Sequence, residues 1–535
     1  MVRVDDLCRS YSDLTYHFDP AEASQAGATS FDGRLGSFGT EAMRAHLAAF
    51  RSLAGAIEEL EPEDLAGEID RTALLDDVRV LLFRFEHEQP HVRQPGFWLN
   101  HLYTGLHSLM VRRQPAAELA PAVLERLKAA PALLDEARAT INAPPIVFVD
   151  AALASLGGGG ELIARAAAHF ASAAPAVAEQ MEAAARDALE ALTRFGRALG
   201  SEIAPSQDAL AHAVGEEQFE RRLHHEHALR GGAPEIWRYG LRLLEETEAQ
   251  VAEAARVLDS RRHWRDVVDG LRHEAGALDL LSAYASEVER AREFIAAHDL
   301  VPEVDAPLVV EATPPFLVPL VPFAAYVRPP LELGGEGRLL VTVPGPQAPP
   351  DPPLWRGGRG RYQLPALACH EAYPGHHLQR SLAQRLPSEV RRRISTSIMV
   401  EGWALYAETL MAEFGFYQTA EARLMQLVNL QWRAARVVLD VGLHTRGMAP
   451  AEAVDRLVAA MPMERRDAEA EVRRYCAMPT YQLSYAVGRR EILALRASWR
   501  AREGADAPLR DFHTALLQHG GLPVALARWG MGLDE

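Results

Sequence analysis

The chain has 535 residues, of which 48% are hydrophobic and 24% are charged, the balance of an ordinary soluble globular protein. Its formal net charge of −17 argues against nucleic acid or an anionic membrane as partner, because phosphate groups would repel it. Three cysteines, far apart in the sequence, predict no disulfide framework and a reducing, cytoplasmic location. We expect no signal peptide and no membrane span, since the first residues lack an apolar run and no stretch approaches ~20 apolar residues.

The first part of the chain, residues 1–300, predicts one helix after another. Residues 41–60 and 216–232 carry apolar side chains at three- and four-residue spacing, with charges between them. Residues 161–199 are rich in alanine, a strong helix former, and show no fixed repeat, which excludes a solenoid. The four glycines at 157–160 lack the strand and the Lys-Ser/Thr pair of a phosphate-binding loop, so we interpret them as an ordinary loop.

The composition changes near residue 300. Three β-like runs, at 307–312, 323–327 and 338–343, are separated by proline and glycine and predict a small sheet. Helical patterns then resume, with breaks at "GFYQ", "GMAP" and "AMPTYQ". The predicted organisation is a helical N-terminal region (1–300), a small sheet with Pro-rich loops (301–350) and a helical catalytic region (351–535), which can form one continuous unit.

One short segment carries the strongest chemical signal. "CHEAYPGHHLQ" begins like the helix of a zinc protease, with His370 followed by Glu371. The usual second histidine would stand four residues after the first, where this chain has Pro374. His376 and His377 follow instead. On a regular helix neither can share an ion with His370, because His377 lies ~10 Å along the axis and His376 about a third of a turn out of phase.

Pro374 can explain how a second histidine could reach the ion. Its ring and its missing N–H force the helix to kink or bulge, and Gly375 gives the backbone freedom to do so. A two-residue bulge would return His376 to the place of the second ligand. We therefore predict His376 as the ligand, with His377 as an alternate ligand or as a residue that supports the site.

A third ligand is predicted on a long amphipathic helix over residues 388–415. Glu401 and Glu408 lie two turns apart on one face of it, and Glu401 stands in an apolar context that makes burial without a partner costly. Glu408 is predicted to support the site or to bind substrate. The alternative is a solvated glutamate. Two histidines and Glu401 would hold one Zn²⁺ ion with an open position, and Glu371 would act on a zinc-activated water as general base and acid.

Other histidines and Cys369 are weaker candidates. Cys369 could be a soft ligand, but without a C-x-x-C partner it is interpreted as a small core residue. His224, His225 and His227 point in different directions on one helix, which predicts a solvated face.

Four segments together resemble the bacterial domain-of-unknown-function 885 family, and the resemblance spans nearly the whole chain. They are "HEAYPGHHLQ" (370–379), "EGWALYAE" (401–408), "RVVLDVGLH" (436–444) and "MPTYQLSYAVG" (478–488), with a looser match at "AAYVRPP" (324–330). The resemblance implies a gluzincin-like zinc metallopeptidase. It also implies a mainly α fold, large, helical and cleft-bearing, with a small sheet beside the active-site helix, similar to Taq-type carboxypeptidases and thimet-type oligopeptidases.

The resemblance also assigns roles. It implies Glu401 as the third ligand and Tyr485 as a phenol near the oxyanion, where a hydrogen-bond donor stabilises a tetrahedral intermediate. The alternative for Tyr485 is a core tyrosine, and Tyr481 is a second candidate. The two-residue expansion of the histidine motif departs from the relatives, so their second ligand does not transfer.

Two further expectations concern the surroundings of the site. Arg436, Asp440 and His444 lie four residues apart on one helix face and are interpreted as a buried ladder that supports the site, the alternative being a substrate-carboxylate site. Residues 337–344 are predicted to bind the peptide backbone along a free strand edge, so that Val341→Pro would raise KM.

The sequence thus favours a zinc-dependent hydrolase that cleaves short peptides. A metal-dependent hydrolase or lyase acting on a non-peptide amide or C–N bond is the first alternative. A non-catalytic helical binding protein with structural histidines is the second.

Overall fold

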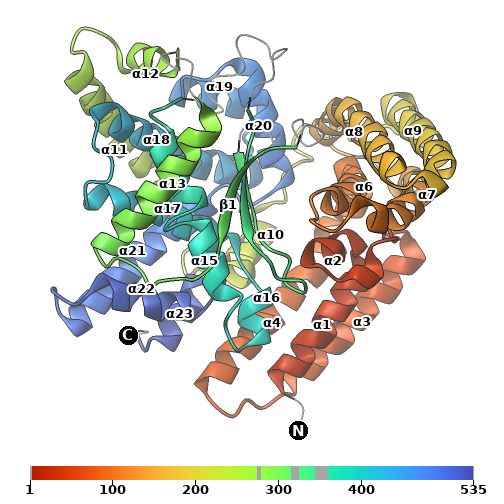
Figure 1. The fold of residues 1–535 in the computed structure, drawn as a ribbon, viewed down its shortest axis with the longest axis horizontal. Helices are drawn as coiled ribbons and strands as arrows, with labels where there is room; N and C mark the ends of the chain where they lie inside the picture. The colour runs from red at the N-terminus through yellow and green to blue at the C-terminus, as the bar shows by residue number, and fades with distance from the viewer. Residues whose placement is uncertain (1–2, 274–278, 315–323, 344–359, 534–535) are drawn as a thin grey trace.

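The computed structural model describes residues 3–273, 279–314, 324–343 and 360–533 (Figure 1). The helices before the sheet are α1 (Val4–Phe18), α2 (Pro20–Ala26), α3 (Thr40–Glu58), α4 (Leu65–Phe83), α5 (Pro90–Arg93), α6 (Pro95–Met110), α7 (Ala116–Thr140), α8 (Ile146–Ala173), α9 (Ala178–Ser201), α10 (Glu216–Arg221), α11 (Ala233–Leu258), α12 (Trp264–His273) and α13 (Leu280–Ala297). The strands are β1 (Leu308–Ala312), β2 (Ala324–Val327) and β3 (Gly337–Val341). After them come α14 (Leu364–Glu371), α15 (His376–Ala383), α16 (Glu389–Arg393), α17 (Ser397–Glu413), α18 (Ala420–Thr445), α19 (Pro450–Ala460), α20 (Arg465–Ala477), α21 (Ser484–Glu503), α22 (Leu509–Leu517) and α23 (Val524–Gly530).

The predicted mainly α fold with one small sheet is confirmed. The three β-like runs form the three strands, and the three expected breaks separate α17 from α18, α18 from α19, and α20 from α21. The expected single helix over 388–415 is wrong, because α16 and α17 are separate helices. Ser395, between them, pairs with Gly521 in an isolated bridge, and this tertiary contact interrupts the helix.

The four glycines at 157–160 lie inside α8, so the predicted loop is wrong. A Cβ added to Gly159 would lie 1.9 Å from the hydroxyl oxygen of Tyr103 on α6. Glycine therefore lets α6 and α8 approach closely, and their packing outweighs the low helix propensity of the four residues.

Helix α8 bears on the expectation that the chain has no membrane span. Among the described residues it is the one helix whose length and composition would allow a crossing, with a mean hydropathy of 1.5 and 33% of that window buried. It packs against α6, α7 and α9 in the N-terminal helical layer. This packing buries only a third of the apolar window, and one helix of this length and composition is by itself weak evidence for a span.

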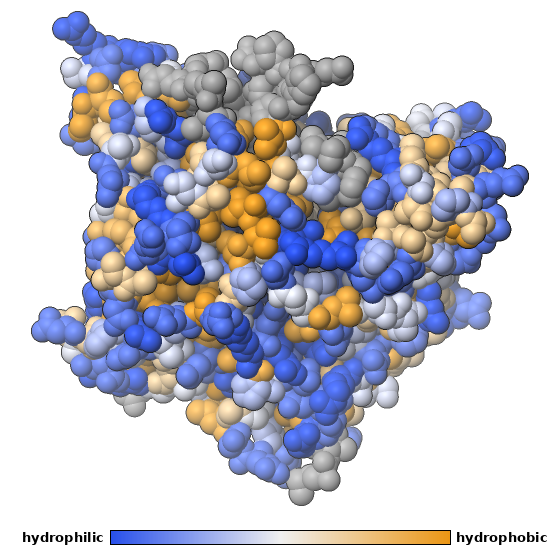
Figure 2. Space-filling model, in the orientation of Figure 1, coloured by the Kyte–Doolittle hydropathy of each residue, from blue (hydrophilic) through white to orange (hydrophobic). Residues whose placement is uncertain are grey.

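The sheet stands between two helical layers, with α1–α3 and α6–α9 on one side, and α11–α13 together with the C-terminal helices on the other (Figure 1). Its central strand, β3, is parallel to β1 and antiparallel to β2. Because side chains alternate along a strand, Leu340 joins the hydrophobic core of the N-terminal helices, while Leu339 and Val341 join a core of the C-terminal helices. Figure 2 shows a hydrophobic band on the face where Figure 1 places the sheet.

The position of β3 overturns the predicted peptide-binding edge at 337–344. β3 is paired on both sides, and Leu339, Leu340 and Val341 are fully buried. A single strand sequence does not reveal its neighbours, and burial on both faces is typical of a central strand.

We expect Val341→Pro to destabilise the protein instead of raising KM. Proline removes a strand N–H and leaves its buried acceptor without a partner, at a cost of about 1–3 kcal/mol. Denaturant unfolding would measure the change. Val343→Pro, at an exposed residue beyond the end of β3, is the control and should cost much less. Equal stability of the two variants would contradict the central placement of β3.

Candidate metal centre

Three side chains from three helices converge at one point. His370 lies in the last turn of α14, His376 begins α15, and Glu401 lies in the second turn of α17. Nε2 of His370 lies 3.6 Å, and Nε2 of His376 3.5 Å, from Oε2 of Glu401. The three donor atoms lie within 4.8 Å of one another. The structure therefore brings together the three residues that the sequence predicted as ligands.

The chain between the two histidines is broken, which is a larger departure than the predicted bulge. α14 ends at Glu371, four residues that include a cis Tyr373–Pro374 peptide follow, and α15 begins at His376. A Cβ on Gly375 would lie 2.0 Å from the carbonyl oxygen of His370, so only glycine allows the two helix ends to approach this closely. The indole N–H of Trp403 donates a hydrogen bond to the Pro374 carbonyl, at 2.8 Å.

His377 points away from this centre. Its Nδ1 lies 3.3 Å from the hydroxyl of Tyr326 on β2, and its Nε2 lies 3.2 Å from the carbonyl oxygen of Ala306. The side chain therefore anchors α15 to the sheet, and His376 is the histidine that faces Glu401. Through these contacts His377 holds the start of α15, which carries His376, in place.

Glu408 fixes the orientation of His370. Its Oε1 lies 2.9 Å from Nδ1 of His370, and the carboxylate is buried. Glu401 and Glu408, two turns apart on α17, thus contact opposite nitrogens of one imidazole. A carboxylate on the remote nitrogen of a histidine ligand sets its tautomer and increases its basicity. This role agrees with the predicted place of Glu408 among the supporting residues.

The electrostatics of the cluster follow from its burial. Burial lowers the pKa of His370, but hydrogen bonds to Glu401 and Glu408 outweigh it and raise the pKa to about 10. Burial raises the pKa of Glu401, whereas His370 and His376 together hold it well below its usual range. Only 13% of the Glu401 side chain is exposed, so the alternative of a solvated glutamate is wrong.

Of the two candidate tyrosines, Tyr481 lies in the segment between α20 and α21, and Tyr485 lies in the first turn of α21. The Tyr481 hydroxyl donates a hydrogen bond to Oε1 of Glu401 at 2.8 Å, which leaves Oε2 directed at the histidines. The Tyr485 ring stacks near the His370 ring, with centroids 6.4 Å apart and an interplanar angle of 17°. Burial, and then the charge of Glu401, raise the pKa of Tyr485, so the phenol stays protonated at neutral pH.

Arg436, Asp440 and His444 support this segment and are not in contact with the metal ligands. Oxygens of the Asp440 carboxylate accept hydrogen bonds from the backbone N–H groups of Thr480 and Leu483, at 3.1 and 2.9 Å. Nε2 of His444 lies 3.1 Å from the carbonyl oxygen of Tyr475, and the Arg436 guanidinium lies over the Tyr485 ring. The three side chains bind different parts of α20 and its loop; Asp440 and His444 approach each other only to 3.9 Å.

A fourth residue that supports the loop before α21 was not predicted from the sequence. His227 is buried, and its Nε2 lies 3.0 Å from the hydroxyl of Thr480. His225 contacts Asp76, so the predicted solvated face holds only for His224, which is exposed. A π-helical turn at Arg222–Glu226 rotates His227 inward, and nothing in the local sequence indicates that turn.

Two further residues complete the description of the site. Glu371 is the last residue of α14, partly buried and directly after His370. Cys369 is fully buried and burial raises the pKa of its thiol, which confirms the interpretation as a core residue. All three cysteines are free, so the expected absence of a disulfide framework is confirmed.

The donor set suits a zinc ion. Two imidazole nitrogens and one carboxylate oxygen leave a fourth position open, as in catalytic zinc sites. The Glu401 carboxylate is largely buried and directs Oε2 at both imidazoles. Burying a charged group without a partner is costly, and a cation among the three donor atoms would offset part of that cost.

We expect Gly375→Ala to abolish stoichiometric zinc binding. The added methyl group would collide with backbone atoms of His370 and Cys369, and the helix ends would have to separate, at a cost of about 1–3 kcal/mol. Metal analysis and thermal unfolding would measure both effects. Gly158→Ala in α8 is the control, because its Cβ would meet nothing within 4 Å. Normal zinc content in Gly375→Ala would contradict the close approach.

We expect zinc binding to release about one proton near pH 8. The pKa of His370 is about 10 in the metal-free fold, above the ordinary value of 6.5. Protonated His370 therefore stabilises the metal-free fold fully below pH 6.5, and this contribution is lost as the pH rises to about 10. Zinc must displace that proton, so its affinity should rise with pH over this window. Calorimetry in two buffers of different ionisation enthalpy would test it, and an affinity independent of pH would contradict it.

Comparisons with known proteins agree with this architecture. A structure from Shewanella oneidensis, described as "a putative lipoprotein of unknown function", superposes with a TM-score of 0.79 at 20% identity over 99% of this chain and 100% of that one. A "putative lipoprotein" from Colwellia psychrerythraea gives 0.77 at 18% identity over 99% of both chains. At these identities the likeness shows the fold alone. No curated protein matches the chain. The family model described as "Bacterial protein of unknown function (DUF885)" matches residues 20–531, and the chain belongs to that family.

Proposed function

We propose that this protein is a zinc-dependent hydrolase that cleaves peptide bonds of short peptides, with a gluzincin-like site. The observation that carries the proposal is the convergence of Nε2 of His370, Nε2 of His376 and Oε2 of Glu401, with Glu371 directly after the first ligand. When bound, zinc would supply a Lewis acid that polarises a carbonyl group and lowers the pKa of a water molecule to near neutrality.

The residues of the chain then have separate tasks. His370, His376 and Glu401 would hold the ion, and Glu408 would keep His370 in the right tautomer. Glu371 would take the proton from the attacking water at its carboxylate and deliver it to the leaving amine. The two steps use one carboxylate, so no second acid is required.

The hydrogen-bond pattern favours Tyr485 over Tyr481 as the donor to the oxyanion. A phenol has one hydrogen to donate, and Tyr481 already donates its hydrogen to Glu401. Tyr485 stays protonated because burial raises its pKa, and its ring lies beside that of His370. Its hydroxyl would stabilise the negative charge that develops on the carbonyl oxygen.

The compartment stays a prediction. Three free, buried cysteines are compatible with the cytoplasm, which the sequence favours. Lipoprotein is the description of the two similar structures and applies to those proteins. Fractionation of cells that produce the native protein would decide, and recovery with membranes would overturn the cytoplasmic prediction.

We expect Glu371→Gln to retain one zinc ion per chain and to lose peptide turnover by about 10²–10⁴-fold, because the amide cannot take a proton. Metal content and hydrolysis of a panel of short peptides and small amides would be measured together. Glu248→Gln, at an exposed residue of α11, is the matched control and should keep both. A wild-type chain without stoichiometric zinc would favour the non-catalytic binding protein. Turnover of amides but not of peptides would favour the non-peptide alternative.

A further inference from the structure

A cationic side chain that forms no ion pair with the described residues lies on the helix that begins with His376. Arg380 is on α15, four residues after His376, so the two side chains share one face of that helix. Arg380 is partly buried, yet no carboxylate pairs with it among the described residues. Burial lowers the pKa of Arg380 to about 10, which still leaves the guanidinium charged at neutral pH. Withdrawing a charge from water without a partner is costly, and such a group is a candidate for binding an anion.

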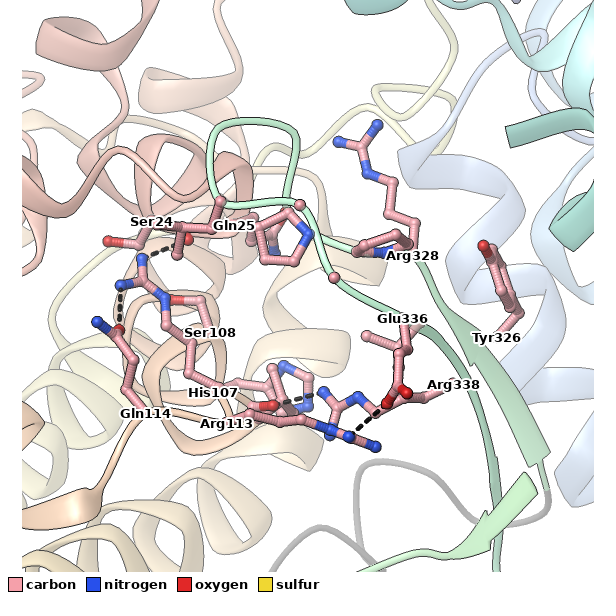
Figure 3. A pocket seen from close by; sticks show the side chains of 18 residues that line it. Ser24, Gln25, His107, Ser108, Arg113, Gln114, Tyr326, Arg328, Glu336 and Arg338 are labelled. Atoms are coloured by element: carbon pink, nitrogen blue, oxygen red, sulfur yellow. Dashed lines mark hydrogen bonds and ion pairs between the residues drawn. The ribbon is translucent and has the colours of Figure 1, made fainter. Parts of the chain in front are cut away.

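A second unpaired arginine follows β2. Arg328 is exposed, has no ion pair with the described residues, and lines a cavity of about 580 Å³ between the sheet and the N-terminal helices. In Figure 3 its side chain extends away from the group of Arg113, Glu336 and Arg338 at the opposite side of the cavity. The other arginines of the lining have acidic partners: Arg112 binds Asp32, Arg113 binds Glu336, and Arg338 binds Glu311.

Arg380 is within electrostatic range of groups that line the cavity and of the candidate metal ligand Glu401. The Tyr326 ring lines the cavity, and its hydroxyl is 3.3 Å from His377, the neighbour of ligand His376. The charge on Arg380 is influenced by Arg328 and Tyr326 from the cavity side, and by Glu401 from the metal side. A substrate that extends from the candidate metal centre along α15 would therefore come near the guanidinium of Arg380.

Resting on the proposed function, we propose that Arg380, assisted by Arg328, binds a carboxylate of the substrate on the cavity side of the metal centre. The preferred substrates are then short peptides with a carboxylate close to the scissile bond. A planar guanidinium donates two parallel hydrogen bonds to a carboxylate, and the pair replaces the counter-charge that Arg380 lacks. The carboxylate can come from the C-terminus of the peptide or from an acidic side chain.

The test measures binding, so it does not depend on turnover. Four peptides are titrated calorimetrically into the zinc-loaded Glu371→Gln protein: Ala-Ala-Ala-Glu and Ala-Ala-Ala-Gln, each with a free C-terminus or a C-terminal amide. We expect the additional substitution Arg380→Gln to weaken binding of the carboxylate-bearing peptides by about 10- to 100-fold, the loss typical of a hydrogen bond to a charged group. The Gln amide, which has no carboxylate, should bind both proteins equally. Comparing the Glu amide with the Gln peptide that has a free C-terminus shows whether Arg380 binds a side-chain carboxylate or the C-terminal carboxylate.

Two further variants make the result decisive. Arg385→Gln removes the same charge from an exposed residue just after α15, whose guanidinium binds the Asp305 carbonyl, and should leave all four affinities unchanged. Arg328→Gln, at an exposed residue, should cause a smaller loss in the same direction even where Arg380→Gln fails to fold. Equal losses for all four peptides, or none in either variant, would overturn the inference. Selective carboxylate binding without hydrolysis by the wild type would instead overturn the proposed function and leave the inference standing.

Discussion

One imidazole held between two carboxylates of a single helix is the interaction on which the site depends. Glu408 contacts Nδ1 of His370 at 2.9 Å, and Glu401 faces Nε2 at 3.6 Å. The two acids stand two turns apart on α17, so the rigidity of that helix sets their separation. Burying two carboxylates is costly, and the charged histidine, or a metal ion at its Nε2, offsets the cost.

Other residues of the centre hold the side chains that surround the His370 imidazole in place. The break between α14 and α15 brings His376 to Glu401, and it requires the missing side chain of Gly375 and the hydrogen bond from Trp403. The loop before α21 is held by Asp440 through two backbone N–H groups; it carries Tyr481 and leads into the first turn of α21, which carries Tyr485. Residues outside the His370, His376 and Glu401 cluster thus determine whether these three side chains meet.

The sheet links the two helical layers at the site. β3 directs alternate side chains into the two cores, and β2 carries Tyr326, which contacts α15, and Val327, which packs against the N-terminal core. A cavity forms where the layers meet. Tyr326 lines it and contacts His377, the neighbour of candidate ligand His376, and Arg328 of its lining has no acidic partner among the described residues. Ligand sites commonly occupy such junctions, since neither layer alone fills the space.

The sequence by itself determined the helical class, the three strands, the family and the identity of the candidate ligands, because these depend on local periodicity and on short motifs of residues with metal-binding chemistry. Tertiary structure decided which strand is central, that the glycines at 157–160 are helical, that His227 turns inward and that His377 faces the sheet. The physical reason is common to all four. Each outcome depends on contacts between segments far apart in the chain. Those contacts outweigh local conformational preference, and they cannot be read from the residues of one segment.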